Sequence, residues 1–314
     1  MERRRLGHSG VEVSRIILGC GNFGGIGSAP ELFGCGESRD EAFALMDAAW
    51  AAGITAFDTA DAYGGGRSET WIGDWMRERG HRPTLTTKTF NPMAAGAESG
   101  LSPERVRRQL ASSLERLGVE RLDCYLAHEF DPETPLADTI TAFEELASAD
   151  AIGSWGVSNF SEAQLRDTLA LGPPVVVQNA YSLLQRDDEA SVLPLCAEHG
   201  VGYTAFSPLA GGWLARRYRR GEPPPAGSRM AVRPGPYEEF RTERTFDALD
   251  ALEAAAHERG VDSATLAVAW LLAQPGVTAV IVGPRRPEQL EPALTALELG
   301  LSSAEAHELA SLVA

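Results

Sequence analysis

The sequence predicts an α/β protein in which eight parallel strands and their helices close into a (β/α)8 barrel, the TIM-barrel architecture. Eight short runs rich in β-branched and apolar residues alternate with amphipathic segments along the 314 residues, which is the order of such a barrel. The runs are continuously or nearly continuously apolar, as expected for parallel strands that are buried on both faces. An open doubly wound sheet is the alternative arrangement of the same units.

A small hairpin at residues 5–13 precedes the strands, and capping signals mark several helix starts between them. Ser38 with Glu41, and Ser161 with Gln164, have the spacing of a capping box. The predicted strands lie at residues 15–20, 55–59, 84–88, 122–128, 154–158, 175–178, 202–206 and 278–282. Glycine follows helical runs in the position of a C-cap, at Gly53, Gly80, Gly118, Gly172, Gly200 and Gly260.

The long segment at residues 210–240 follows the seventh predicted strand and contains three consecutive prolines. Segments of this length are functional lids or disordered insertions. Because this one follows a strand end, where a barrel keeps its active site, we expect a lid. Helices are expected at 242–259, 263–274 and 302–313. No linker divides the chain, so we expect one domain over residues 1–314.

A glycine-rich stretch after the first strand has the spacing of a dinucleotide-binding fingerprint, with glycine at positions 19, 21 and 24. In that fingerprint the glycines open a helix. The residues that follow here, including Gly25, Gly27 and Pro30, are typical of a loop. We therefore interpret the stretch as a loop of the barrel.

Composition and charge exclude several classes of function. The formal net charge of -16 argues against binding to nucleic acid or to anionic membranes. The longest apolar stretch, residues 266–273, is too short to span a bilayer, and the first residues lack the apolar core of a signal peptide. The cysteines have no metal-ligand spacing and are expected to be reduced thiols in a cytoplasmic protein, at Cys20, Cys35, Cys124 and Cys196.

Polar or titratable residues stand at the end of almost every predicted strand. In a barrel the carboxyl ends of the strands meet at one rim, where the chemistry is carried out. A barrel with a purely structural role has no need of such side chains there. The residues at or just after the strand ends include Asp58, Tyr63, Lys88, His128, Ser158, Asn159, Gln178, Asn179, Ser207 and Arg285.

Four of these residues together suggest proton transfer to a carbonyl. Lys88 is the only lysine of the chain, and the pKa of a buried lysine, unlike that of arginine, moves readily. Its charge can lower the pKa of the Tyr63 phenol, while Asp58 keeps the ammonium ionised. His128 can donate a hydrogen bond that orients the carbonyl. Tyr63 is then the general acid.

Each of the four residues also has an ordinary structural explanation when taken alone. Asp58 could cap a turn, and a lone histidine such as His128 is more often a core residue than a catalytic one. Their common position at one rim favours the site. Because the set holds an acid but no redox group, it predicts a nicotinamide cofactor as the hydride source.

These residues lie in segments that resemble the aldo-keto reductase superfamily, and the resemblance covers essentially the whole chain. The most specific match is FDTADAYGGGRSE at residues 57–69, which is similar to the family's first signature. Other matching segments follow in order: TTK at 86–88, YLAHEFD at 125–131, GVSNF at 156–160, QNAYS at 178–182, FSPLAGG at 206–212 and VGPRRPEQ at 282–289.

The resemblance implies which residues act in catalysis and which bind the cofactor. It implies a carboxamide site at strands five and six, an aromatic stack on the nicotinamide and a 2′-phosphate site after strand eight, where two arginines suit the charge. NADPH is the expected cofactor, with NADH as the alternative. The implied catalytic residues are Asp58, Tyr63, Lys88 and His128. The implied cofactor-binding residues are Gly21, Asn22, Asp58, Ser158, Asn159, Gln178, Phe206, Ser207, Leu209, Gly211, Gly283, Arg285, Arg286 and Gln289.

The sequence departs from the family pattern at three places. Phe206 stands where many members have tyrosine, so a ring remains to stack but the hydroxyl is absent. Pro292 and Ala293 stand where the family often has Glu-Asn to contact adenine. The loop at residues 24–37 is longer than expected and contains Cys35; it is either part of the substrate pocket or a surface insertion.

The expected function is reduction of an aldehyde or ketone, so the expected partner is a small carbonyl compound. A sugar or alcohol dehydrogenase that works in the reverse direction is one alternative. A redox-sensing regulatory subunit that binds NADPH tightly and turns over slowly is another, because some members of the superfamily act in that way. The sequence does not predict the oligomeric state.

Overall fold

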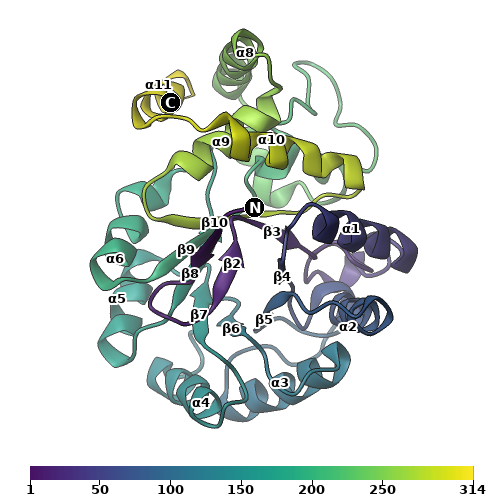
Figure 1. The fold of residues 1–314 in the computed structure, drawn as a ribbon, viewed down its shortest axis with the longest axis vertical. Coiled ribbons are helices and arrows are strands. Elements are labelled where there is room, and N and C mark those ends of the chain that lie inside the picture. Colours follow the sequence, from purple (N-terminus) through teal and green to yellow (C-terminus); the bar gives the residue numbers. More distant parts are fainter. Residues whose placement is uncertain (314) are drawn as a thin grey trace.

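A computed structural model describes residues 1–313, and a closed barrel of eight parallel strands lies at its centre (Figure 1). The strands follow one another around the barrel in chain order, and the last pairs with the first, which excludes an open sheet. Each predicted strand is found. They are β3 (Ile16–Gly19), β4 (Ala56–Asp58), β5 (Thr84–Thr89), β6 (Cys124–Ala127), β7 (Trp155–Ser158), β8 (Val176–Ala180), β9 (Gly202–Phe206) and β10 (Val277–Val282).

The predicted hairpin is formed by β1 (Arg3–Arg5) and β2 (Glu12–Ser14), which pair in antiparallel register before the chain enters the barrel. The first helices surround the strand ring (Figure 1). These are α1 (Arg39–Ala51), α2 (Arg67–Arg79), α3 (Pro103–Leu117), α4 (Leu136–Ser148), α5 (Glu162–Leu171) and α6 (Val192–His199).

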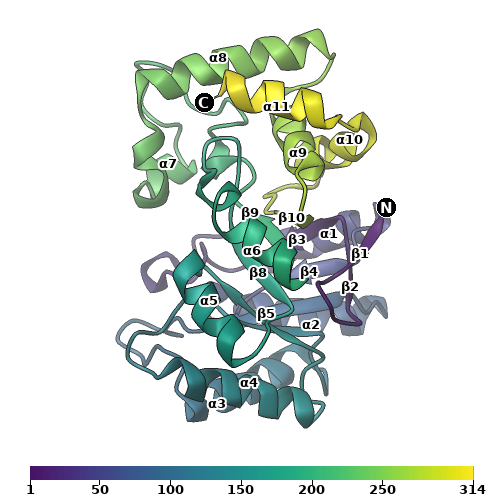
Figure 2. The ribbon, with the colours of Figure 1, turned by 90° about the vertical axis from the view of Figure 1, so that its left-hand side faces the viewer.

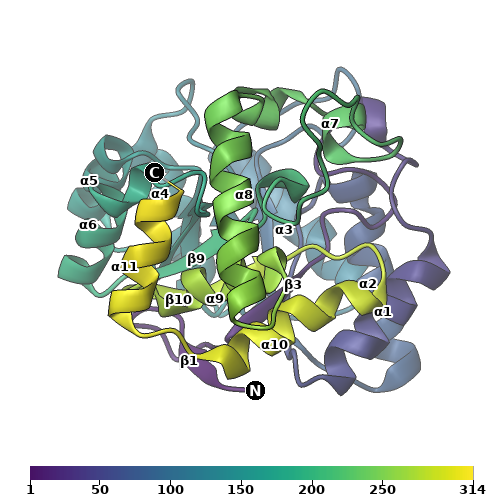
Figure 3. The same cartoon turned by 90° about the horizontal axis from the view of Figure 1, so that it is seen from above.

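The later helices form a separate group at one side of the barrel, which is at the top of Figure 2. Figure 3 shows α8 and α11 lying side by side, and both contact α9. The group comprises α8 (Glu243–Glu258), α9 (Ser263–Ala273), α10 (Glu291–Leu299) and α11 (Ser303–Leu312), and the short helix α7 (Arg229–Val232) precedes it. Within residues 1–313, the structure contains no helix of the length and apolar character needed to cross a membrane.

The capping signals are mostly confirmed. Ser38 and Ser161 each form a complete capping box with the side chain three residues later. Helices α2, α3 and α6 end in a glycine with left-handed backbone, as predicted. Gly172 is the exception, because its φ of -174° is extended and it ends α5 without that turn.

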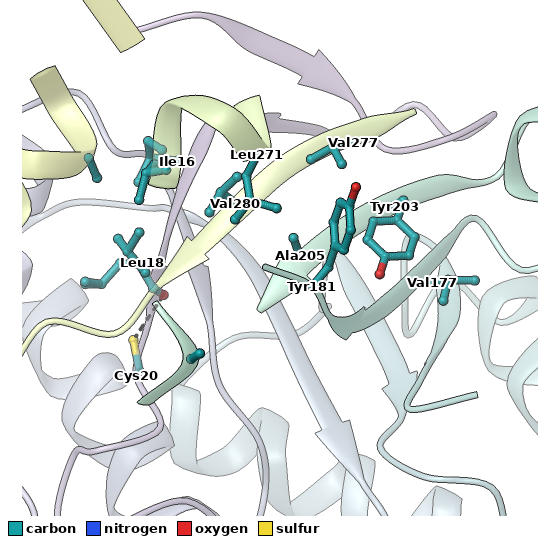
Figure 4. Close-up of a cluster of buried hydrophobic side chains, with 14 of the residues drawn as sticks. Ile16, Leu18, Cys20, Val177, Tyr181, Tyr203, Ala205, Leu271, Val277 and Val280 are labelled. Carbon is teal, nitrogen blue, oxygen red and sulfur yellow. Dashed lines mark hydrogen bonds between the residues drawn. The ribbon is translucent and has the colours of Figure 1, made fainter. Parts of the chain in front are cut away.

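The core of the barrel is continuous across the seam between β10 and β3. All six residues of β10 are buried, as are Ile16 and Leu18 of β3. Figure 4 shows Ile16, Leu18, Val277 and Val280 in one cluster with Tyr203 of β9 and Leu271 of α9. Their burial on both faces of the sheet explains why the strands read as continuous apolar runs.

A buried arginine ties this seam at the amino ends of the strands. Arg15 is 2% exposed. Its Nη1 donates to the carbonyl oxygens of Val277 at 2.7 Å and Thr278 at 2.6 Å, and its Nη2 donates to that of Leu272 at 2.5 Å. Burial lowers the pKa of Arg15 to about 10. One side chain therefore connects the start of β3 with the end of α9 and the start of β10.

Candidate active site

The barrel brings the polar residues of the predicted strand ends to one rim. Asp58 is the last residue of β4, Ser158 is the last of β7, and His128 directly follows β6. Parallel register places Ser158 beside Gln178 of β8. These residues line a cleft of about 1230 Å³, and the buried Lys88 of β5 lies beneath it.

Lys88 and Asp58 form a buried ion pair at the base of the cleft. Lys88 Nζ lies 2.5 Å from Asp58 Oδ1 and 2.7 Å from the carbonyl oxygen of Thr59. The second oxygen of Asp58 accepts a hydrogen bond of 2.8 Å from Gln178 Nε2. Burial lowers the pKa of Lys88, but Asp58 and Tyr63 outweigh it, so the pKa lies above its usual value. Lys88 is therefore an ammonium at neutral pH.

Tyr63 enters the cleft from the glycine-rich turn after β4. Its Oη lies 3.5 Å from Lys88 Nζ, and its ring meets the His128 ring edge-on with centroids 5.6 Å apart. Burial raises the pKa of Tyr63 and the nearby ammonium opposes the rise, so the net shift is upward. Lys88 does lower the pKa of Tyr63, as expected, but burial of the phenol outweighs that charge.

His128 is held as a neutral imidazole. Burial, together with the positive charges of Lys88 and Arg233, keeps its pKa well below the usual value. Its main-chain carbonyl accepts a hydrogen bond of 2.9 Å from Asn159 Nδ2. Its Nδ1 has no hydrogen-bond partner within residues 1–313. A neutral ring can donate one hydrogen bond into the cleft without adding a charge there.

Three residues that line the cleft adopt left-handed backbone although they are not glycine. They are Asn159 at φ 59°, Ser207 at φ 54° and Arg216 at φ 54°. This conformation costs free energy and is retained where the surrounding structure requires it, often at functional sites. Asn159 Nδ2 also approaches Ser158 Oγ at 3.2 Å. The amide and hydroxyl groups match the donors and acceptors of a carboxamide.

A model of the aldo/keto reductase family matches residues 15–314. The chain belongs to this family. An uncharacterized oxidoreductase of Bacillus subtilis is 35% identical over 96% of this chain and 92% of that relative. A probable voltage-gated potassium channel subunit beta of rice is 32% identical over 95% of the chain and 92% of its own length. A similarly named protein of Arabidopsis thaliana is 31% identical over 95% of the chain.

Membership of the aldo/keto reductase family supports an oxidoreductase that uses a nicotinamide cofactor. The cleft fits such a cofactor in the chemistry of its lining, which includes amide side chains hydrogen-bonded to Asp58 and to the main chain of His128, and an arginine after β10. All the implied cofactor-binding residues line it except Arg286, which is exposed and lies outside the lining. Pro292 and Ala293 also line the cleft.

The 210–240 segment of this aldo/keto reductase lies along the cleft. Arg229 donates to Asn22 Oδ1, and the carbonyl oxygen of Gly227 accepts a hydrogen bond of 3.1 Å from Arg285. The segment's near end is fixed to α8 by the ion pairs of Arg216 and Arg220. The segment is therefore joined to the loops after β3 and β10 at one end and to α8 at the other.

Two buried carboxyl groups at or near the site of the aldo/keto reductase were not predicted, and only the first of them lines the cleft. Glu37 lines the cleft and forms an ion pair with Arg285. Asp61 lies two residues before Tyr63, and burial raises its pKa to about 7. The only sequence signal for Asp61 is its place in the signature at 57–69. No sequence pattern indicated a role for Glu37, because its partner Arg285 is 248 residues away in the chain.

Proposed function

We propose that this aldo/keto reductase transfers a hydride from NADPH to the carbonyl of an aldehyde or ketone, with Tyr63 as the proton donor. The observation that carries the proposal is the contact chain from Asp58 through Lys88 to Tyr63, with distances of 2.5 and 3.5 Å. A permanent positive charge thus stands beside a half-buried phenol that lines the cleft. A structural ion pair alone does not require that phenol.

The site's residues divide the work of carbonyl reduction. The bound reduced nicotinamide supplies the hydride. Because its pKa is raised, Tyr63 is protonated at neutral pH and can give its proton to the carbonyl oxygen. Lys88 stabilises the phenolate that remains, since a positive charge at this distance in a dry site interacts strongly with it. The neutral His128 donates a hydrogen bond that orients the carbonyl oxygen.

The remaining lining residues would hold the cofactor along the cleft. Ser158, Asn159 and Gln178 would bind the carboxamide, and Phe206 would stack against the nicotinamide ring. At the other end the guanidinium of Arg285 would take the 2′-phosphate, with Gln289 beside it. Two features of Arg285 support this placement. Its backbone N–H donates a hydrogen bond of 2.7 Å to Gln289 Oε1, and its side chain is 46% exposed.

The test is oxidation of NADPH and of NADH over a panel of aldehydes, α-dicarbonyls and ketones, followed by the loss of the nicotinamide absorbance. Tyr63→Phe should lower kcat by about 10²- to 10⁴-fold, the range of a lost general acid, without weakening cofactor binding. Tyr125→Phe is the control, because its buried hydroxyl contacts the carbonyl oxygen of Val106 outside the cleft. Undiminished turnover in Tyr63→Phe would refute the proposed role.

Two other functions use the same site. Faster turnover of alcohols with NAD⁺ than of carbonyls with NADPH would favour the dehydrogenase direction. The relatives named as channel β subunits support a second candidate, a regulatory subunit that retains its cofactor. Stopped-flow measurement of cofactor release separates the two: release slower than about one per minute, with no rapid turnover, would favour the regulatory role.

A further inference from the structure

We propose that Glu37 sets the cofactor preference of this enzyme by offsetting the charge of Arg285, so that the adenosine site accepts a ribose 2′-hydroxyl about as readily as a 2′-phosphate. The inference rests on the proposed function, since it takes Arg285 to be the residue that meets the 2′-position. It predicts use of both NADH and NADPH and assigns the control of that choice to one side chain.

The main chain holds Glu37 in a fixed position. Its N–H donates to the carbonyl oxygen of Asn22 at 2.9 Å, and its own carbonyl accepts from the N–H of Gly24 at 3.0 Å. Gly36 before it is packed so closely that an added Cβ would lie 1.9 Å from the oxygen of Asn22. The longer loop at 24–37 is therefore a compact element that delivers this carboxylate to the cleft, and it is not a loose surface insertion.

Only one of the two carboxylate oxygens of Glu37 accepts a hydrogen bond from Arg285. Its Oε1 accepts a hydrogen bond of 2.7 Å from Arg285 Nε, and its side chain is 3% exposed. Its Oε2 is buried and has no hydrogen-bond partner within residues 1–313. Burial raises the pKa of Glu37, and the contact with Arg285 opposes that rise. A buried oxygen of this kind is costly unless a donor reaches it.

The carboxylate of Glu37 should have opposite effects on the ribose of NADPH, which carries a 2′-phosphate, and on that of NADH, which carries a 2′-hydroxyl. A 2′-phosphate on Arg285 would meet the like charge of Glu37, which already occupies the Nε edge of the guanidinium. A 2′-hydroxyl is a donor and can satisfy a carboxylate oxygen, which is how acidic residues select NAD over NADP in other dinucleotide sites. The exposed outer edge of Arg285 can still hold a phosphate, so the preference for NADPH over NADH is reduced but not reversed.

The test uses two cofactor fragments, adenosine 2′,5′-bisphosphate and adenosine 5′-monophosphate, with dissociation constants measured by calorimetry. In the unaltered chain we expect the bisphosphate to bind less than about thirtyfold more tightly, a small preference for an added dianion. Glu37→Gln should raise that preference at least about fivefold, the effect of removing one nearby like charge at the surface of the cleft. The NADPH-to-NADH ratio of kcat/KM should rise in parallel.

Glu288→Gln is the matched control. It removes the same charge three residues from Arg285, but Glu288 is exposed and does not line the cleft. A folded Glu37→Gln variant whose preference changes no more than that of the control would overturn the inference. So would a preference above about thirtyfold in the unaltered chain, and this measurement decides the matter even if the variant does not fold.

The fragments contain no nicotinamide, so the result does not depend on finding a carbonyl substrate. Carbonyl reduction with no change in fragment preference would overturn the role of Glu37 and leave the proposed function intact. If Glu37→Gln shows the expected shift in fragment preference but the protein turns over no carbonyl, the role of Glu37 stands and the proposed function is refuted. If neither fragment binds, the cofactor site itself is wrong, and both proposals fail.

Discussion

The ammonium of Lys88 lies 2.5 Å from the carboxylate of Asp58, and neither side chain is more than 5% exposed. Two charges at this depth depend on each other, because the desolvation of each is offset mainly by its partner. The pair also fixes the acid beside it, since Tyr63 Oη is within 3.5 Å of the same nitrogen. The stability of the fold and the proposed activity therefore both depend on the contact between Lys88 and Asp58, and substitutions at these two residues can separate the two effects.

We predict that Lys88→Met abolishes carbonyl reduction and lowers the free energy of unfolding by about 3–5 kcal/mol, because it strands the Asp58 charge. The double variant Lys88→Met, Asp58→Asn removes that charge and should recover most of the stability but none of the activity. Urea unfolding and turnover on the same preparations measure both. Turnover in the double variant would show that the ammonium is not required.

His128 is expected to stay neutral in the folded protein as the pH falls through the usual pKa of histidine, because burial and two nearby cations hold its pKa well below that value. Imidazole NMR signals, assigned with a His128→Asn variant, check this directly. As the pH falls below about 6.5, the unfolded chain takes up a proton that the folded histidine does not. This residue therefore contributes a loss of stability on acidification. A ring that titrates in the folded state near its usual pKa would contradict the assignment.

Asp61 is expected to contribute the opposite pH dependence. Its folded pKa of about 7 lies above the value of an unfolded aspartate, so the folded state holds a proton that the unfolded chain loses. Its contribution to stability is complete below about pH 4 and is lost as the pH rises through 7. Between pH 5.5 and 8 the loss should be on the order of 2 kcal/mol. Urea unfolding should show a flatter pH dependence in Asp61→Asn; an unchanged slope would mean that the carboxyl is ionised throughout.

Arg15→Met should destabilise the fold by about 3 kcal/mol, because the carbonyl oxygens of Leu272, Val277 and Thr278 lose the hydrogen bonds of one buried side chain. Arg4→Met is the control: Arg4 also donates to the carbonyl oxygen of Val277, at 3.3 Å, but its side chain is 43% exposed. The control should change the free energy of unfolding by no more than about 0.5 kcal/mol. Thermal and urea unfolding measure both, and equal effects would show that burial of Arg15 adds nothing.

The sequence was most informative where local signals and topology agree. Short runs of mostly β-branched and apolar residues predicted all eight barrel strands, and Ser38 with Glu41 predicted the start of α1, since both signals depend only on neighbouring residues. The rim followed from the fold, because parallel strands carry their end residues to one edge. Asp58, Tyr63 and Lys88 could thus be grouped before any distance was known.

The remaining features depend on packing between distant segments. Whether Tyr63 has a raised or lowered pKa is decided by how completely the phenol is buried, which no spacing reveals. The ion pair of Glu37 with Arg285 joins segments 248 residues apart. The prediction of a left-handed C-cap at Gly172 was wrong for a local reason. The chain leaves α5 in an extended conformation toward Pro173 and Pro174, so a left-handed turn is not needed there.

The pairing of β3 with β10, which Arg15 connects, also determines when the barrel can close during synthesis. The carbonyl partners of Arg15 at the start of β10 are 262 and 263 residues away. While the ribosome is still making the chain, β3 lacks its neighbour on one side and the growing sheet ends at its newest strand. Both open edges can pair with other chains until β10 emerges. The nascent protein therefore passes most of its synthesis as an unclosed sheet that benefits from chaperone protection.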